Sequence, residues 1–393
     1  MKRSLLLALL LLTSISVWAT SAPGLNAAPP ADAIVLFDGT KLDAWTNSQE
    51  SPTAWSIENG VLTGKPGNSA LTSRQLFADC QLHLESRGSA DGVLLLQGRY
   101  LIPLPAAAGT ASPDWQSYDI TFRAPRFNND GSLKSPGTAT ALRNGVLVQD
   151  HVELKGSATK PGQPGYEKHA FKLPLVLQAT SHQVSFRNLW IRELGVQQLL
   201  NGKNLSGWYS YLEKLGKNND PEGNFKIADG VLHIEGKNFG YVATEQSFAN
   251  YYLKAVFKWG QHQYAPRATG KRDSGILYHF ALTEEDKVWP KSIECQVQEE
   301  DCGDFWCVGT MIETPNAWKT EWNMKHVIRT ANFENPLGEW NTIEIICNGD
   351  QLEHYVNGHL VNSGTNASVS SGKILLQSEG AEVYYRSVEL IPY

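Results

Sequence analysis

The segment Ser292–Asp301, SIECQVQEED, combines carboxylates and amides in a pattern that could support chemistry. Successive side chains of an extended strand point to opposite faces, so Glu294, Gln296 and Gln298 share one face while apolar residues occupy the other. The apolar face suits a core between two sheets. The polar face would line an exposed, concave surface, where a carboxylate can transfer protons or bind a cation and amides can orient a ligand. The solvated outer face of a surface strand is an alternative that the alternation leaves open.

A second segment, Arg272–Phe280 with the sequence RDSGILYHF, is predicted to form the preceding strand. Its alternation places His279 on the face of Leu277 and Tyr278 on the opposite face. If the two strands are neighbours, His279 or Tyr278 could approach Glu294. A single histidine on a half-apolar strand is, however, more often a hydrogen-bonded structural residue than a functional one.

These segments belong to the second of two related halves of the chain. LFDGTKLDAW at residues 36–45 returns as LLNGKNLSGW at residues 199–208, and further landmarks recur in the same order. Two long copies indicate tandem domains rather than a solenoid, whose short repeats need several copies to be stable. We expect a first domain over residues 33–194 and a second over residues 195–393, joined without a flexible spacer.

Comparison of the two copies assigns any carboxylate site to the second. At the corresponding place the first copy has only the shortened run Asp91–Leu104, DGVLLLQGRYLIPL. That run contains no equivalent of Glu294, Gln296 or Gln298. The first copy is therefore expected to brace the second copy or to bind a ligand.

Short runs rich in branched and aromatic residues recur between glycine, asparagine and aspartate turns in both copies. Asn59-Gly60 and Asn144-Gly145 in the first copy, and Asn357-Gly358 in the second, are strong hairpin signals because a type I′ turn needs positive φ at both central residues. No long window has the apolar spacing of a substantial helix. The sequence therefore predicts an all-β fold of two tandem antiparallel β-sandwiches of the jelly-roll type.

Composition excludes one class of partner. The 393 residues carry a formal net charge of -6 without a basic cluster, so nothing would neutralise a run of phosphates, and nucleic acid is not an expected partner. A hydrophobic content of 41% and a charged content of 19% are typical of a soluble globular protein.

The N-terminus predicts export. Lys2 and Arg3 precede the apolar run Leu5–Trp18, and small residues of the kind that a signal peptidase reads follow. A transmembrane anchor is the weaker alternative, because the run is short for a membrane span. We predict a signal peptide over residues 1–19, a flexible segment over residues 20–32, no stable membrane span after cleavage, and a periplasmic or extracellular location.

Export permits disulfides, but an odd number of cysteines leaves at least one thiol unpaired. Cys80 is alone in the first copy. Cys302 and Cys307 could close a small loop, while Cys295 and Cys347 could pair or remain buried thiols. The spacing is not that of a CxxC motif and argues against a zinc site built on cysteines.

Several motifs occur together and in order: SGILY, SIECQVQEEDCGDFW, EWNTIEI, VNGHLVN and LLQSEG in the second copy, and LFDGTKLDAW, NGVLVQDHVEL and FRNLWIREL in the first. Through them the chain resembles the 3-keto-disaccharide hydrolase family, a domain with a concanavalin A-like jelly-roll fold. The resemblance covers nearly all of residues 199–393 and, more weakly, residues 33–194. It implies a carbohydrate substrate, namely a glycoside already oxidised to a ketone at ring carbon 3.

A ketone at carbon 3 acidifies the proton on carbon 2. A base can remove that proton, the glycosidic oxygen on carbon 1 can leave, and water can add to the product, which gives net hydrolysis. Such chemistry needs a general base, an electrophile that stabilises the enolate and an acid for the leaving oxygen. A divalent cation of the Ca²⁺ or Mn²⁺ kind could be the electrophile.

The resemblance also implies roles for individual residues. Glu294 is expected to be the general base or, together with Asp304, a metal ligand, and His279 is expected to be its acid–base partner. The other candidates are expected to bind the sugar, with Trp306 as a stacking platform: Arg272, Tyr278, Gln296, Gln298, Trp306 and Glu379.

Two alternatives to an enzyme remain at this point. A lectin-like module could bind glycans with the same concave face, and a structural repeat protein would need no site at all. Because one fold can host all three, the arrangement of the side chains must discriminate among them. A pocket that joins Glu294 to His279 would favour the enzyme, whereas a shallow aromatic groove would favour the lectin.

Overall fold

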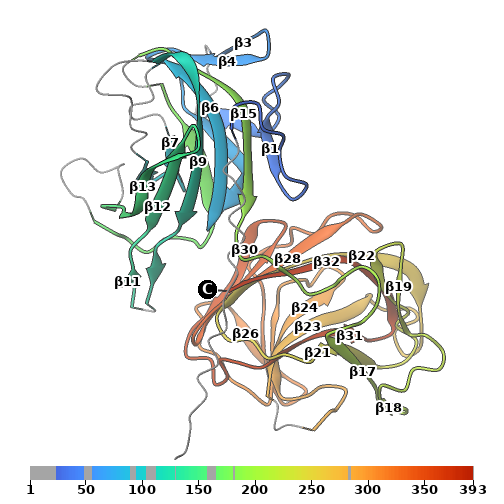
Figure 1. Cartoon of the computed structure of the whole chain (residues 1–393). Coiled ribbons are helices and arrows are strands. Elements are labelled where there is room, and N and C mark those ends of the chain that lie inside the picture. The colour runs from blue at the N-terminus through green and yellow to red at the C-terminus, as the bar shows by residue number, and fades with distance from the viewer. Residues whose placement is uncertain are drawn as a thin grey trace, which may run out of the picture. The chain divides into compact units, whose positions relative to one another are not determined.

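The computed structural model describes most of the chain, over residues 24–47, 55–88, 94–102, 112–128, 130–156, 165–179, 182–281 and 285–392. The predicted signal peptide lies outside the described residues. Within them, all the regular elements are β-strands, as Figure 1 shows. The described residues include no helix that is long and apolar enough to cross a membrane.

The described residues form two compact units. The first extends to Ala124 and also contains Gly137–Gly165 and Lys172–Arg192. The second consists of Glu193–Tyr393 together with two short segments, Pro125–Pro136 and Tyr166–Phe171. The second unit therefore includes two pieces of the sequence region that was expected to form the first domain.

The first unit contains two antiparallel sheets. In spatial order, the strands of the larger sheet are β13 (Val146–Glu153), β12 (Thr138–Arg143), β9 (Ser112–Arg123), β6 (Cys80–Gly88), β15 (Val184–Glu193), β4 (Val61–Gly64) and β3 (Ser56–Glu58), with β1 (Ile34–Phe37) paired to β15. The strands of the smaller sheet are β2 (Trp45–Asn47), β5 (Leu71–Phe77), β14 (Leu173–Leu177), β7 (Leu94–Leu96) and β8 (Tyr100–Leu101).

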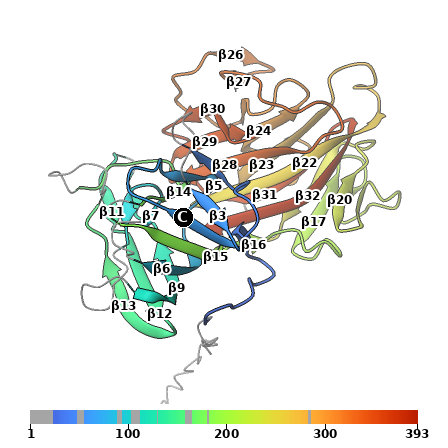
Figure 2. The ribbon, with the colours of Figure 1, turned by 90° about the horizontal axis from the view of Figure 1, so that it is seen from above.

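The second unit is also built from two antiparallel sheets, which are seen from two directions in Figures 1 and 2. The first, called the back sheet here, has the order β19 (Phe225–Ala228), β20 (Val231–Ile234), β32 (Ala381–Pro392), β22 (Tyr251–Gln263), β28 (Asn341–Asn348), β29 (Gln351–Val356) and β30 (His359–Gly364), with β16 (Gln197–Gln198) on β32. The second, called the front sheet, has the order β18 (Gly216–Lys217), β17 (Trp208–Leu212), β21 (Gly240–Thr244), β31 (Lys373–Ser378), β23 (Asp273–Phe280), β24 (Ser292–Gln298), β25 (Phe305–Val308), β27 (Met324–Val327) and β26 (Trp318–Glu321). A separate hairpin pairs β10 (Arg126–Phe127) with β11 (Leu133–Ser135).

The core of the second unit lies between its two sheets and confirms the alternation predicted for β24. Ile293, Cys295 and Val297 are fully buried in this core together with residues of the back sheet. Each fully buried aliphatic side chain of this kind stabilises the fold by about 1.5–3 kcal/mol. The predicted all-β fold of tandem antiparallel sandwiches is confirmed as well.

The alternation predicted for β23 holds only to Tyr278. The register with β31 shifts between Tyr278 and Phe280, and His279 at the shift has a φ of 60°. This β-bulge moves Phe280 onto the face of Leu277, while Tyr278 stays in the core. The expectation that His279 shares a face with Leu277 is therefore wrong, because an extra residue at the bulge changes the period.

All five cysteines are buried free thiols, so neither suggested disulfide is formed. Burial raises the pKa of Cys295 and of Cys302 well above the usual thiol value. Because the thiolate is the reactive species, these side chains are packing residues rather than nucleophiles.

Candidate active site

Strand pairing in the front sheet places several predicted residues in one row. Glu294 on β24 lies opposite Leu277 on β23 and opposite Trp306 on β25. The row continues from Trp306 to His326 on β27 and from Leu277 to Leu375 on β31. Neighbouring strands are about 4.8 Å apart, so Trp306 is the next side chain to Glu294 on the outer face of the sheet.

Glu294 extends its carboxylate over Gly275, which lies on β23 opposite Gln296. A Cβ added at Gly275 would collide with Glu294 Oε1 and would lie 2.8 Å from Gln377 Oε1. The missing side chain at Gly275 is therefore the space that Glu294 occupies, and Gln377 borders the same space. Glu294 is only 5% exposed. No described residue forms a hydrogen bond or an ion pair with its carboxylate.

Two further carboxylates surround this space and share one guanidinium group. Arg267 Nη2 lies 2.5 Å from Asp273 Oδ2 and 2.6 Å from Glu379 Oε1. Gln298 donates to Asp273 Oδ2 at 2.7 Å, and Trp289 donates its indole N–H to Glu379 Oε2 at 3.3 Å. Asp273 and Glu379 are almost completely buried, at 1% and 6% exposure. The predicted residues Gln298 and Glu379 thus belong to the same constellation as Glu294.

This constellation contains more negative charge than its single arginine can balance. Burial, and then the charges of Glu379 and Asp273, raise the pKa of Glu294 well above its ordinary value. Burial and Glu379 likewise raise the pKa of Asp273, against the opposing effect of Arg267. The pKa of Glu379 is raised by burial in spite of its ion pair with Arg267. Carboxyl groups whose pKa values are raised by burial and by one another are typical of sites that transfer protons.

Polar atoms without partners point to a ligand at this place. Gln296 Oε1, Asp273 Oδ1 and both amide atoms of Gln377 are buried and have no hydrogen-bond partner among the described residues. Leaving such a group unpaired costs about 1–3 kcal/mol. Buried polar atoms are nearly always paired in native proteins, so a ligand, a cation or water is needed to complete the site.

The same oxygen atoms are of the type that a hard cation prefers. Glu294, Asp273 Oδ1, Gln296 Oε1 and Gln377 Oε1 are carboxylate and amide oxygens, which Ca²⁺ and Mn²⁺ prefer. Asp304, the second ligand expected from the sequence, is engaged elsewhere. His326 lies 2.6 Å from Asp304 Oδ2, and a backbone amide donates to Oδ1 at 2.9 Å. A metal role for Asp304 stays a prediction that would require it to give up His326.

Trp306 is oriented by its neighbour rather than by hydrogen bonds. Its ring stacks on His326 with a centroid separation of 4.0 Å and an interplanar angle of 13°. His326 is itself held between Asp304 and Glu321, 2.9 Å from Glu321 Oε2. Although burial acts to lower it, the pKa of His326 is raised by the hydrogen bonds that its ring donates to these two carboxylates. A rigid indole next to Glu294 is suited to stacking on a sugar ring.

Three of the predicted site residues lie away from Glu294. His279 is fully buried, packs edge-on against Tyr251 and Tyr278, and has its pKa lowered to about 4 by burial. Tyr278 is in the core, where its hydroxyl lies 2.8 Å from His354 Nε2. Arg272 pairs with a different carboxylate, Glu299, at 3.1 Å. The structure therefore does not join Glu294 to His279, and the roles predicted for these three residues have no geometric support.

The constellation also contains residues that were not predicted. Asp273 and Gln377 could have been found from alternation, because Asp273 shares a strand face with Leu277, which pairs with Glu294, and Gln377 shares one with Leu375 in the same row. Arg267 and Trp289 lie outside the strands, in connections whose course no periodicity predicts. They reach the constellation only through tertiary structure.

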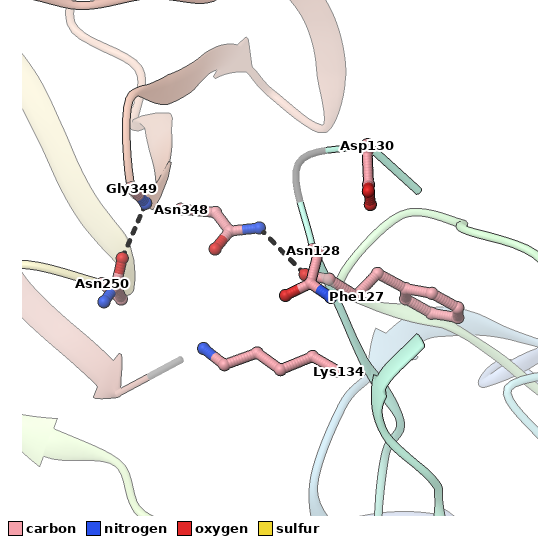
Figure 3. A pocket seen from close by; sticks show the side chains of 7 residues that line it. All are labelled: Phe127, Asn128, Asp130, Lys134, Asn250, Asn348 and Gly349. Carbon is pink, nitrogen blue, oxygen red and sulfur yellow. Dashed lines mark hydrogen bonds between the residues drawn. The ribbon is translucent and has the colours of Figure 1, made fainter. Parts of the chain in front are cut away.

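A separate pocket of the second unit, about 470 Å³ in volume, has no comparable chemistry. Figure 3 shows the hairpin residues Phe127 and Lys134 on one side and Asn348 on the other. Asn348 Nδ2 donates to the Phe127 carbonyl at 3.3 Å, and the Gly349 amide donates to Asn250 at 2.7 Å. The lining amides satisfy one another, so the pocket is a weaker candidate than the constellation around Glu294.

Comparisons with known proteins place the chain in a family. The family model described as the 3-keto-alpha-glucoside-1,2-lyase-like domain matches residues 32–106, 99–192 and 195–391. The first copy accounts for two of these segments and the second copy for the third. No curated protein matches the chain.

Solved structures are similar to parts of the chain. A protein from Parabacteroides distasonis, provisionally named a glycosyl hydrolase, is 32% identical, covers 42% of this chain and 85% of its own, and has a TM-score of 0.38. A second such protein from the same organism is 20% identical, with 51% and 94% covered and a TM-score of 0.36. The β-glucanase of Bacillus licheniformis is 12% identical, with 51% and 99% covered and a TM-score of 0.34.

The family model thus spans both copies and includes all the strands that carry the constellation. The resemblance inferred from the ordered motifs is confirmed. The chain belongs to the family of 3-keto-alpha-glucoside-1,2-lyase-like domains and is a carbohydrate-active, hydrolase-like protein.

Proposed function

We propose that this protein cleaves glycosides whose ring carbon 3 is a ketone, by elimination across carbons 1 and 2 followed by hydration. The observation that carries the proposal is the buried, unpaired carboxylate of Glu294 above Gly275, which faces partnerless amides on the outer face of the front sheet. A carboxylate in this state is a strong base that no internal hydrogen bond restrains.

In the elimination step, Glu294 accepts the proton from carbon 2. The electrons of the broken C–H bond form a double bond between carbons 1 and 2, and the glycosidic oxygen leaves carbon 1 as an alcohol after it takes up a proton. The raised pKa of Glu294 supports this role, because a base works best when its pKa lies near the working pH. Water then adds across the double bond, with hydroxyl at carbon 1 and hydrogen at carbon 2.

The proton for the leaving oxygen comes from the same carboxyl group cluster. Asp273 and Glu379 share Arg267, and both have raised pKa values. Carboxyl groups this close cannot all ionise, so one holds a proton while another is charged. This pairing supplies an acid and a base within one site without the histidine that the sequence suggested.

The enolate formed from the ketone needs positive charge or hydrogen bonds. In this mechanism the Gln377 amide nitrogen, which has no partner among the described residues, donates a hydrogen bond to the ketone oxygen, and Gln296 Oε1 accepts one from a sugar hydroxyl. A divalent cation held by Glu294, Asp273, Gln296 and Gln377 would polarise the ketone oxygen. Trp306 and the partly exposed Trp289 supply apolar surface for the sugar rings.

The proposal includes export to the periplasm or beyond, which rests on the charged and apolar N-terminus alone. A 3-keto-glycoside must be made by an oxidation of the sugar, so the enzyme would act after a glycoside 3-dehydrogenating reaction.

The test is turnover of a chromogenic 3-keto-glucoside by the full mature chain, with and without a chelator. Glu294→Gln should lower the rate by about 100- to 10,000-fold, because it removes the base but keeps the shape. Glu300→Gln, at an exposed glutamate after β24, is the matched control and should retain activity. An inert wild type that is retained on glycan columns would establish the lectin-like alternative, and cleavage of unoxidised glucosides would exclude the elimination mechanism.

A further inference from the structure

A second cluster of titratable side chains lies in the back sheet of the second unit, apart from the constellation of the front sheet. His233 on β20, Glu235 just after β20, and Glu382 on β32 place one ligand atom each within 4.8 Å of one another. His262 on β22 borders them, with Nδ1 3.2 Å from Glu382 Oε2. We propose that these four residues, called the His233 cluster, bind one transition-metal ion of the Zn²⁺ type.

The separations between the donor atoms suit ligation. His233 Nε2 lies 2.9 Å from Glu382 Oε1 and 3.7 Å from Glu235 Oε2. Donors that surround a zinc ion tetrahedrally at about 2.0–2.1 Å lie about 3.3–3.4 Å from one another. The observed distances fall on both sides of this value, so small rotations of the side chains would admit an ion that replaces the proton of His233 Nε2.

The surroundings hold the donors in place before any ion binds. The Tyr384 ring stacks on His233 with a centroid separation of 4.6 Å and an interplanar angle of 11°, and its hydroxyl donates to Glu382 at 2.7 Å. Tyr264 donates its hydroxyl to Glu235. Metal ligands in proteins are usually oriented by such outer hydrogen bonds, which fix the ring and the carboxylate.

An irregularity in the sheet directs two backbone amides at Glu382. The pairing of β22 with β32 is interrupted between Trp259 and Gln263. The amides of Gln261 and His262 in this interval donate to Glu382 Oε2 at 2.9 and 3.2 Å. A Cβ at Gly260 would collide with the Glu382 carboxylate, so the glycine makes room for it.

The donor set selects the kind of metal. Imidazole nitrogen favours zinc and similar ions, whereas Ca²⁺ prefers oxygen ligands alone. An ion here would join β20, β22 and β32 and stabilise the second unit without taking part in the proposed reaction.

The test measures zinc retained by the untagged mature chain after equilibration with a zinc buffer and dialysis. We expect the chain to retain one equivalent of Zn²⁺, and its melting temperature to rise with zinc concentration. Equilibration with a Ca²⁺ buffer instead should leave no Ca²⁺ at the His233 cluster. His233→Phe keeps the stack on Tyr384 and removes the donor, so it should lose the ion. His262→Asn, at a side chain that is 66% exposed, should fold normally and weaken zinc binding about 10-fold or more.

Two controls separate the His233 cluster from other sites. His151→Asn removes a solvent-exposed histidine of the first unit that pairs with a single carboxylate, Asp150, and should retain the full equivalent. Glu294→Gln removes a ligand of any ion at the front sheet, and this variant should also retain the full equivalent of zinc at the His233 cluster. Absence of stoichiometric zinc in the wild type, or equal retention in both His233→Phe and His262→Asn, would overturn the proposal.

Discussion

Replacement of Gly275 by alanine tests whether the position of Glu294, rather than its chemistry alone, supports activity. The added Cβ would lie 2.8 Å from Glu294 Cδ, whereas carbon atoms in contact are about 3.5–4.0 Å apart. The carboxyl group must therefore retreat by about 1 Å. Such a displacement of a catalytic group costs about 100-fold in rate, or about 2.7 kcal/mol of transition-state stabilisation.

The assay compares kcat/KM on a 3-keto-glucoside for wild type, Gly275→Ala and Gly270→Ala. Gly275 lies in a strand with ordinary backbone angles, and what it displaces is the end of a side chain, so the fold should persist in circular dichroism. Gly270 is the matched control, since its nearest neighbour would be the Arg267 carbonyl at 4.0 Å. A folded Gly275→Ala protein with activity within about twofold of wild type would refute the placement of Glu294 as the base.

Further predictions concern stability and substrate affinity. Burial raises the pKa of Glu294 in the folded state, so its contribution to stability is present below about pH 4.5 and is lost as the pH rises. Glu294→Gln should therefore raise the unfolding free energy at pH 7, measured by urea denaturation, by about 1 kcal/mol or more. An unchanged unfolding free energy would contradict the raised pKa of Glu294. Burial lowers the pKa of His279 to about 4 and of His354 to about 3, so stability should fall as the pH drops from the usual histidine value of 6.5, and a melting temperature constant between pH 7 and pH 4 would disprove this. Trp289→Ala should raise KM about 2- to 10-fold with little change in folding, while Trp322→Ala, at an exposed turn, should leave KM unchanged.

The fold was largely predictable from local patterns. Alternation along β24 correctly separated Ile293 and Cys295 from Glu294, because a strand with one face in a core must keep the period of two. The Asn-Gly turns indicated antiparallel hairpins, and the internal repeat of two long copies indicated tandem domains. The assignment of two first-copy segments to the second unit was not predictable, since it depends on contacts between residues far apart in the sequence.

The site was predictable only where its residues share a strand face. Glu294 and Gln298 followed from alternation, whereas Arg267 comes from a connection and reaches the carboxylates only in the folded state. His279 was misplaced because a bulge leaves no clear trace in the residue types around it. The titratable side chain of β23 that acts on Glu294 is the carboxyl group of Asp273, not the expected imidazole of His279.

The bulge at His279 has a consequence for how this family can vary. Up to Tyr278, alternate residues of β23 face the core, and after the bulge the alternation is shifted by one residue. The alternation before and after the bulge is called the frame of the strand here. A single-residue insertion or deletion within β23 would exchange buried and outward residues and remove Gly275 from beneath Glu294. The same length change in the connection at residues 264–272 would leave that frame intact. Natural variation in length should therefore be absent from the strand, and in the connection it should occur only where Arg267 can still reach Asp273 and Glu379.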